Sequence, residues 1–106
     1  MSHGNIITPE KLAKYFDVTG RALAKVKLVP APQADLQKAA VDFLDMAQRY
    51  YADAKHFVEK GDIVTAFAAL NYAHGWLDAG ARLGLFDVGG DSTLFTVDGS
   101  ELREHR

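Results

Sequence analysis

Four polar residues recur at helical spacing within the most apolar stretch of this chain. They are Asn71, His74, Asp78 and Arg82. Positions three or four apart lie on the same side of a helix, so these side chains should form one polar edge. A histidine beside a carboxylate can act as a general base or as a metal ligand. The polar edge is therefore the first place to look for chemistry.

A structural role for His74 is the competing interpretation, and the pattern favours it. Two such groups are too few for a metal site, and no nucleophile accompanies them in the sequence. A buried imidazole needs hydrogen-bond partners, and Asp78 can orient it or pair with Arg82 one turn further on. We expect no catalytic residue, no metal ligand and no cofactor site.

A second group of candidates is basic and lies near the N-terminus. Its members are Lys11, Lys14, Arg21 and Lys25, which share one face of a predicted helix. This docking strip has the charge to bind phosphate or an acidic partner. No aromatic residues interleave with the basic ones, so nucleic acid is a weak prediction and a solvated helix face is the favoured interpretation.

A third pattern is the segment RYYADAKH, in which Arg49 and His56 are two helical turns apart. It resembles the arginine, spacer, histidine signature of helical HEPN-type ribonucleases. That resemblance implies cleavage of a phosphodiester by two side chains on one solvent face. Acidic neighbours at Asp45 and Asp53 favour ion pairs with Arg49 instead. A ribonuclease using these residues, or His74, is kept as the alternative function.

Three helices are predicted to carry these residues, at about 9–27, 33–60 and 62–84, followed by a tail over 85–106. Thr8, Pro9 and Glu10 are typical of a helix start, and the two prolines after Val29 end the first helix. Gly61 suits the end of the second helix and Asp62 the start of the third. The second and third helices should therefore form a tight antiparallel hairpin.

Large and small apolar residues alternate along the second helix at spacings of four and three. They are Leu36, Ala40, Phe43, Ala47, Tyr50, Ala54 and Phe57. This regularity predicts coiled-coil-like packing, because alanines let neighbouring backbones approach closely.

The third helix is apolar nearly all round, which is typical of a buried helix. Something should therefore cover both of its sides. The tail offers one cover, through Phe86, Leu94, Phe95 and Val97. These residues are expected to fold over the side of the third helix that carries Tyr72, Trp76 and Leu83. The rival prediction is a dimer interface on that same surface.

The run ALNYAHGWLDAGARLGLF, preceded by an alanine-rich helix and a Glu-Lys-Gly-Asp turn, resembles a mostly archaeal family called domain of unknown function 357. The similarity extends over roughly Thr8 to Val97 and is sharpest from Tyr72 to Phe86. It implies a three-helix bundle of the immunoglobulin- and albumin-binding-domain-like type. It implies no activity, because the family has no established catalytic residues.

Length and composition fit a single ordinary domain. The chain has 106 residues, of which 48% are hydrophobic and 25% charged, with a formal net charge of −2. Zero cysteines exclude disulfides and thiolate metal sites. No apolar run reaches the roughly 18 residues of a membrane span, so we expect no membrane partner and a cytoplasmic location.

These observations together predict an all-α three-helix bundle with a short extended C-terminal tail. Its expected function is a non-catalytic binding or interaction module, whose partner is another protein or a second copy of itself. The alternatives are the HEPN-like ribonuclease and a homodimeric structural protein.

Overall fold

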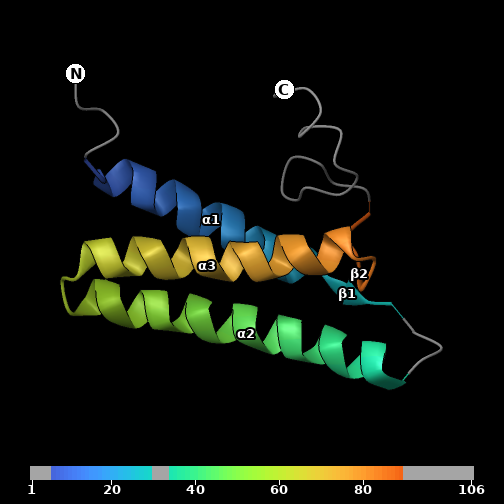
Figure 1. Cartoon of the computed structure of the whole chain (residues 1–106). Coiled ribbons are helices and arrows are strands. Elements are labelled where there is room, and N and C mark those ends of the chain that lie inside the picture. The colour runs from blue at the N-terminus through green and yellow to red at the C-terminus, as the bar shows by residue number, and fades with distance from the viewer. Residues whose placement is uncertain (1–5, 30–33, 90–106) are drawn as a thin grey trace, which may run out of the picture.

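The chain is an all-α three-helix bundle, described here from a computed structural model over residues 6–29 and 34–89. The helices are α1 (Pro9–Lys25), α2 (Ala34–Glu59) and α3 (Ile63–Arg82). Two very short strands, β1 (Lys27–Leu28) and β2 (Phe86–Asp87), follow α1 and α3. In Figure 1, α3 lies between α1 and α2. None of the helices in the described part of the chain has the length and hydropathy of a membrane-spanning segment.

Capping side chains fix where α1 and α3 begin. Thr8 Oγ1 accepts a hydrogen bond from the backbone N–H of Lys11 at 3.1 Å, and Pro9 occupies the first turn. Asp62 Oδ1 accepts one from the backbone N–H of Thr65 at 3.2 Å. Each bond satisfies an amide that the helix itself leaves unpaired. Gly61 takes a φ of 78°, and this left-handed conformation lets α2 turn directly into α3.

Alanines form the line along which α2 meets α3. Ala40, Ala47 and Ala54 are at most 1% exposed and recur every seven residues. Their small side chains let the two helix backbones approach closely. On one side of this line α2 presents Phe43, Tyr50 and Phe57, and on the other side it presents Leu44, Tyr51 and Val58 to α1.

The sequence predicts that Leu36 continues this line, but it is 44% exposed. The reason lies in the length of α3. Phe43 already contacts Trp76 near the C-terminal end of α3, and α3 ends at Arg82. Leu36 lies two turns before Phe43 in α2, so it extends past the end of its partner helix.

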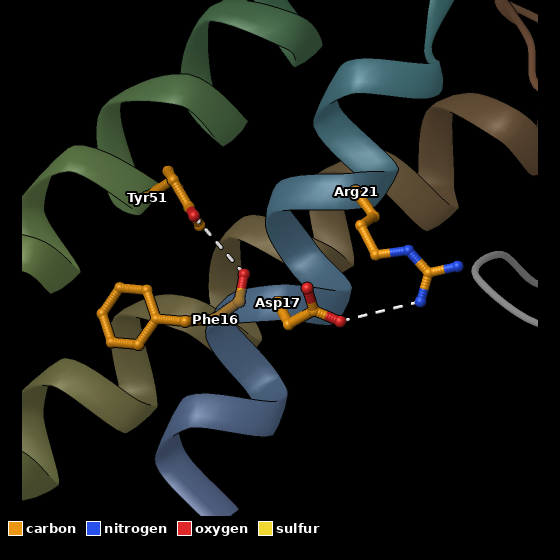
Figure 2. A network of polar contacts seen from close by, with 4 residues as sticks. All are labelled: Phe16, Asp17, Arg21 and Tyr51. Atoms are coloured by element: carbon orange, nitrogen blue, oxygen red, sulfur yellow. Dashed lines mark hydrogen bonds and ion pairs between the residues drawn. The ribbon is translucent and has the colours of Figure 1, made fainter.

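Helix α1 crosses the side of the hairpin that carries Tyr51. Leu12, Thr19 and Ala22 are its buried residues. Tyr51 donates a hydrogen bond to the carbonyl oxygen of Phe16 at 3.4 Å, and the two rings meet edge to face (Figure 2). A Cβ atom on Gly20 would lie 2.7 Å from the Tyr51 hydroxyl. Gly20 therefore makes room for Tyr51, which the sequence alone does not indicate.

The strand pair closes one end of the bundle and is absent from the sequence-based prediction. The first helix ends at Lys25, two residues before the predicted end, because Val26 adopts an extended conformation. Lys27 then pairs with Asp87 and Leu28 with Phe86 in antiparallel register. Strands of two residues are too short to show alternation in a sequence.

Phe86 returns from β2 onto α3 and is only 4% exposed. Its ring lies directly against Gly80, in the space that a Cβ atom would occupy. Leu85 and Val88 are buried in the same cluster. The remaining apolar tail residues, Leu94, Phe95 and Val97, lie outside the described residues.

Candidate functional site

His74 is held between α1 and its own helix. Its Nδ1 lies 3.2 Å from the hydroxyl oxygen of Thr19 on α1, and its Nε2 lies 3.7 Å from Asp78 Oδ1. The Asp78 contact becomes an ion pair when the imidazole is protonated. Both ring nitrogens therefore face a polar partner, as a partly buried histidine requires.

Thr19, His74 and Asp78 place a hydroxyl, an imidazole and a carboxylate next to one another. These are the functional groups of a hydrolytic triad. The Thr19 hydroxyl, however, belongs to a residue that is 1% exposed inside the bundle, so a substrate cannot reach it. Among the described residues, no group of three metal-binding side chains could hold a metal ion. The geometry fits a histidine that fastens α1 to α3.

A small pocket of about 260 Å³ opens beside His74 between α1 and α3. Its lining residues come from the two helices and are Tyr15, Val18, Asn71, His74, Gly75 and Asp78. Arg82, the last member of the polar edge, is exposed one turn beyond Asp78 and does not line the pocket.

Gly75 stands out among the glycines inside the helices. A Cβ atom on Gly75 would meet nothing within 4 Å, whereas one on Gly20 would meet Tyr51 and one on Gly80 would meet Phe86. Glycine in a helix interior costs about 1 kcal/mol relative to alanine. Packing among the described residues does not explain that cost at Gly75.

The docking strip borders the same pocket from the α1 side. Lys14, Arg21 and Lys25 are exposed, and Val18 between them lines the pocket. The strip is partly engaged by contacts within the chain. Lys11 Nζ lies 5.7 Å from the centre of the Phe67 ring, and Arg21 Nη1 lies 3.6 Å from Asp17 Oδ2 (Figure 2).

Arg49 and His56 are both exposed on α2. Arg49 Nε lies 2.9 Å from Asp45 Oδ2, so one of its acidic neighbours pairs with it as the sequence suggests. The His56 ring lies 6.1 Å from that of Phe57. This arrangement is a helix surface with a local ion pair.

The other side of the α2–α3 hairpin carries a row of aromatic rings that meet edge to face. Phe43 contacts Trp76 at 5.0 Å, Trp76 lies 6.1 Å from Tyr72, and Tyr72 contacts Tyr50 at 4.5 Å, all between ring centroids. The buried indole N–H of Trp76 has no hydrogen-bond partner within the described parts of the chain. A groove of about 410 Å³ beside Tyr50 and Tyr72 continues the row toward Phe57.

Next to this row, α3 exposes a set of side chains that carry no charge themselves, with the exposed Arg82 beside them. Val64, Tyr72 and Leu83 are 71%, 51% and 67% exposed. Such exposure is unusual for three large residues on one side of a helix. Four smaller or polar residues are exposed between them. The whole set, called here the uncharged ridge, is Val64, Ala68, Asn71, Tyr72, Gly75, Ala79 and Leu83. The described residues leave this side of α3 open, although its sequence suggests cover on both sides.

The model of the family described as Protein of unknown function (DUF357) matches residues 14–86 of the chain. No curated protein and no solved structure matches the chain. The matched region runs from the docking strip on α1 to Phe86 in β2 and contains the whole of α2 and α3. It covers more than half of the chain, and the protein therefore belongs to the DUF357 family.

Proposed function

We propose that this protein is a non-catalytic interaction module that binds an apolar protein surface through the uncharged ridge. The observation that carries this proposal is the exposure of Val64, Tyr72 and Leu83 on the helix at the centre of the fold. Exposed apolar patches of this kind mark interaction sites, because covering them removes apolar surface from water.

The row of aromatic rings also supports the uncharged ridge as the binding surface. Tyrosine and tryptophan are enriched in protein interfaces, since they offer a large rigid area with a polar end. Tyr72 belongs both to the row and to the ridge, and the groove beside Tyr50 and Phe57 gives a partner side chain somewhere to enter. The small residues Ala68, Gly75 and Ala79 let a partner backbone come close.

The contacts of the candidate catalytic residues also fit a binding function better than catalysis. His74 is bonded to a buried threonine, and Arg49 is paired with Asp45. The ribonuclease alternative needs both Arg49 and His56 available to a phosphodiester. The docking strip remains a second candidate surface, because it borders the pocket that Gly75 leaves open.

The test is a binding experiment with two matched lysine variants. Leu83→Lys places a charge on the ridge, and Ala52→Lys places one at an exposed position on α2. The immobilised protein is exposed to lysate of a related organism, captured proteins and RNA are identified, and each protein hit is purified and titrated directly.

The proposal expects a protein whose binding is lost in Leu83→Lys and kept in Ala52→Lys. Binding that survives Leu83→Lys but is lost when Lys14 and Arg21 are both changed to Glu moves the site to the docking strip. Capture of RNA alone contradicts the proposal.

A further inference from the structure

We infer that the groove between α2 and α3 beside Tyr50 and Tyr72 is a site for a basic side chain, an arginine of the partner protein. The groove has aromatic walls and one carboxylate, and no lysine or arginine is among the described residues that line it. That the arginine belongs to a protein rests on the proposed function, which brings a partner onto the neighbouring uncharged ridge.

Aromatic rings from both helices of the hairpin wall the groove. Tyr50 and Phe57 come from α2, and Tyr72 comes from α3. The rings of Tyr50 and Tyr72 lie at 83° to one another with their centroids 4.5 Å apart, so they form two nearly perpendicular sides. The small residues Ala68 and Ala69 leave the space of about 410 Å³ between the helices open. The faces of aromatic rings attract cations, so these walls suit a positively charged group.

Asp53 places a carboxylate at the edge of the groove. It lies one turn after Tyr50 and one turn before Phe57, so the three side chains share one face of α2. Asp53 is exposed and makes no ion pair with another described residue. Arg49, one turn before it, pairs with Asp45 instead, at 2.9 Å between Nε and Oδ2. The carboxylate of Asp53 is therefore available to a cation from a partner.

The chain places two of its own lysines over aromatic rings elsewhere in the bundle. Lys11 Nζ lies 5.7 Å from the centre of the Phe67 ring, and Lys55 Nζ lies 4.8 Å from that of Tyr51. Both rings also contact aromatic residues of α1. The groove lies on the other side of the hairpin, and within residues 6–29 and 34–89 no lysine or arginine covers its rings. A cation for these rings has to come from a partner.

Arginine fits the lining groups better than lysine or an apolar side chain does. Its planar guanidinium can stack on a tyrosine ring and also donate two parallel hydrogen bonds to the Asp53 carboxylate. The hydroxyl of Thr65, which lines the groove, offers a further acceptor. The methylene groups of the arginine can lie along Ala68 and Tyr72. An apolar side chain would cover Asp53 without pairing its charge, which is unfavourable.

The groove adjoins the uncharged ridge. Ala68 and Tyr72 belong to both, so a partner seated on the ridge also lies over the rim of the groove. Such a partner excludes water and thereby strengthens the attraction between its arginine and Asp53. Arg82, the basic residue beside the ridge, is roughly 25 Å from Thr65 along α3. The basic group of the partner is therefore directed to the end of α3 that carries Thr65.

The site is tested with two small probes of nearly the same shape. Acetylarginine amide carries the guanidinium, and acetylcitrulline amide carries an uncharged urea in its place. Each probe is titrated into the wild-type protein at low salt, because salt screens exposed charges, and the backbone amide chemical shifts are followed by NMR. We expect saturable shifts at Asp53, Ala68 and Ala69 with the arginine probe. The dissociation constant of the citrulline probe should be about tenfold higher or more.

Two variants locate the arginine probe. Asp53→Asn removes the carboxylate and Tyr72→Leu removes an aromatic wall, and each should raise the dissociation constant about tenfold. Asp42→Asn is the matched control and should leave it unchanged. Asp42 is exposed on the same face of α2, about three turns or 16 Å before Asp53. Equal binding of the two probes, binding unchanged in Asp53→Asn, or no saturable binding overturns the inference.

Captured proteins separate this inference from the proposed function. The partner inferred here binds more weakly to Leu83→Lys and to Asp53→Asn, and replacing one of its surface arginines by glutamine has the same effect. If a captured protein is lost in Leu83→Lys but binds Asp53→Asn normally, the proposed function stands and the arginine site fails. If the arginine probe binds but no protein is captured, the proposed function fails. The groove then takes a small guanidinium compound, and the inference of a protein arginine is overturned.

Discussion

The hydroxyl of Thr19 and the imidazole of His74 form a hydrogen bond of 3.2 Å that joins α1 to α3. Among the described residues, Thr19 is the polar residue that the core buries, at 1% exposed. A side chain so deeply placed is stable there only when its hydroxyl is bonded. The pair therefore ties α1, which packs less extensively than the hairpin helices do, to the centre of the bundle.

Thr19→Val should lower the free energy of unfolding by about 1–2 kcal/mol, because a valine of the same shape leaves Nδ1 of His74 without this partner. Urea denaturation followed by circular dichroism measures the loss. Nitrogen chemical shifts of the His74 ring supply a second readout, which Thr19→Ser should leave near the wild type. A Val variant whose His74 shifts are unchanged contradicts the bond.

Two glycines of α3 should respond to alanine in opposite directions. Gly75→Ala should raise the free energy of unfolding by up to about 1 kcal/mol, the difference in helix propensity, since its Cβ meets nothing. Gly80→Ala should lower it by about 1–3 kcal/mol, because its Cβ collides with the Phe86 ring.

Both glycine variants are best measured on the Leu83→Lys background, so that association through the uncharged ridge does not contribute to the measured stability. Adding Phe86→Leu to Gly80→Ala should recover part of the stability, since the smaller side chain leaves room for the Cβ. Equal effects at the two glycines would show that Phe86 does not rest on α3.

The helices can be predicted from the sequence and the short strands cannot, and the difference has a physical cause. Capping at Thr8 and Asp62 and the regular alanines of α2 are local or periodic signals, so they can be read directly. The pairing of Leu28 with Phe86 joins distant residues over two positions, which leaves no periodic trace.

The same limit applies to the candidate site. The polar edge is visible in the sequence because its spacing is helical, but the partner of His74, Thr19, lies 55 residues away. The sequence does not show that the uncharged ridge is exposed. An apolar helix in a sequence indicates burial without identifying the molecule that covers it.

Phe86→Ala should open the end of the bundle and cost about 3–5 kcal/mol, the usual range for a buried phenylalanine. The backbone N–H of Val29, which donates to the carbonyl of Leu85 at 3.1 Å, should then exchange with solvent faster than amides in the middle of α2. Leu28→Ala is the matched control, since Leu28 pairs with Phe86 but is 37% exposed. Unchanged exchange at Val29 would mean that Phe86 does not hold the strands.

No cleavage of single-stranded or structured RNA is expected, because Arg49 is paired with Asp45 and His56 lies on a plain helix surface. Purified wild type is assayed beside Arg49→Ala and His56→Ala. A trace of activity equal in all three is contamination. Activity present in the wild type and abolished in both variants would establish the ribonuclease instead.

The homodimeric alternative predicts that the thermal stability of the wild type depends on protein concentration. A second copy bound to the folded chain stabilises it by mass action, so the midpoint of unfolding rises as the chain is concentrated. Leu83→Lys and Val64→Lys should remove this dependence. Both side chains are well exposed in the single chain. Neither variant should therefore change the stability of the dilute chain by more than about 0.5 kcal/mol. Calorimetry over a hundredfold concentration range measures both effects, and a midpoint that is constant for the wild type would leave the uncharged ridge without a second copy.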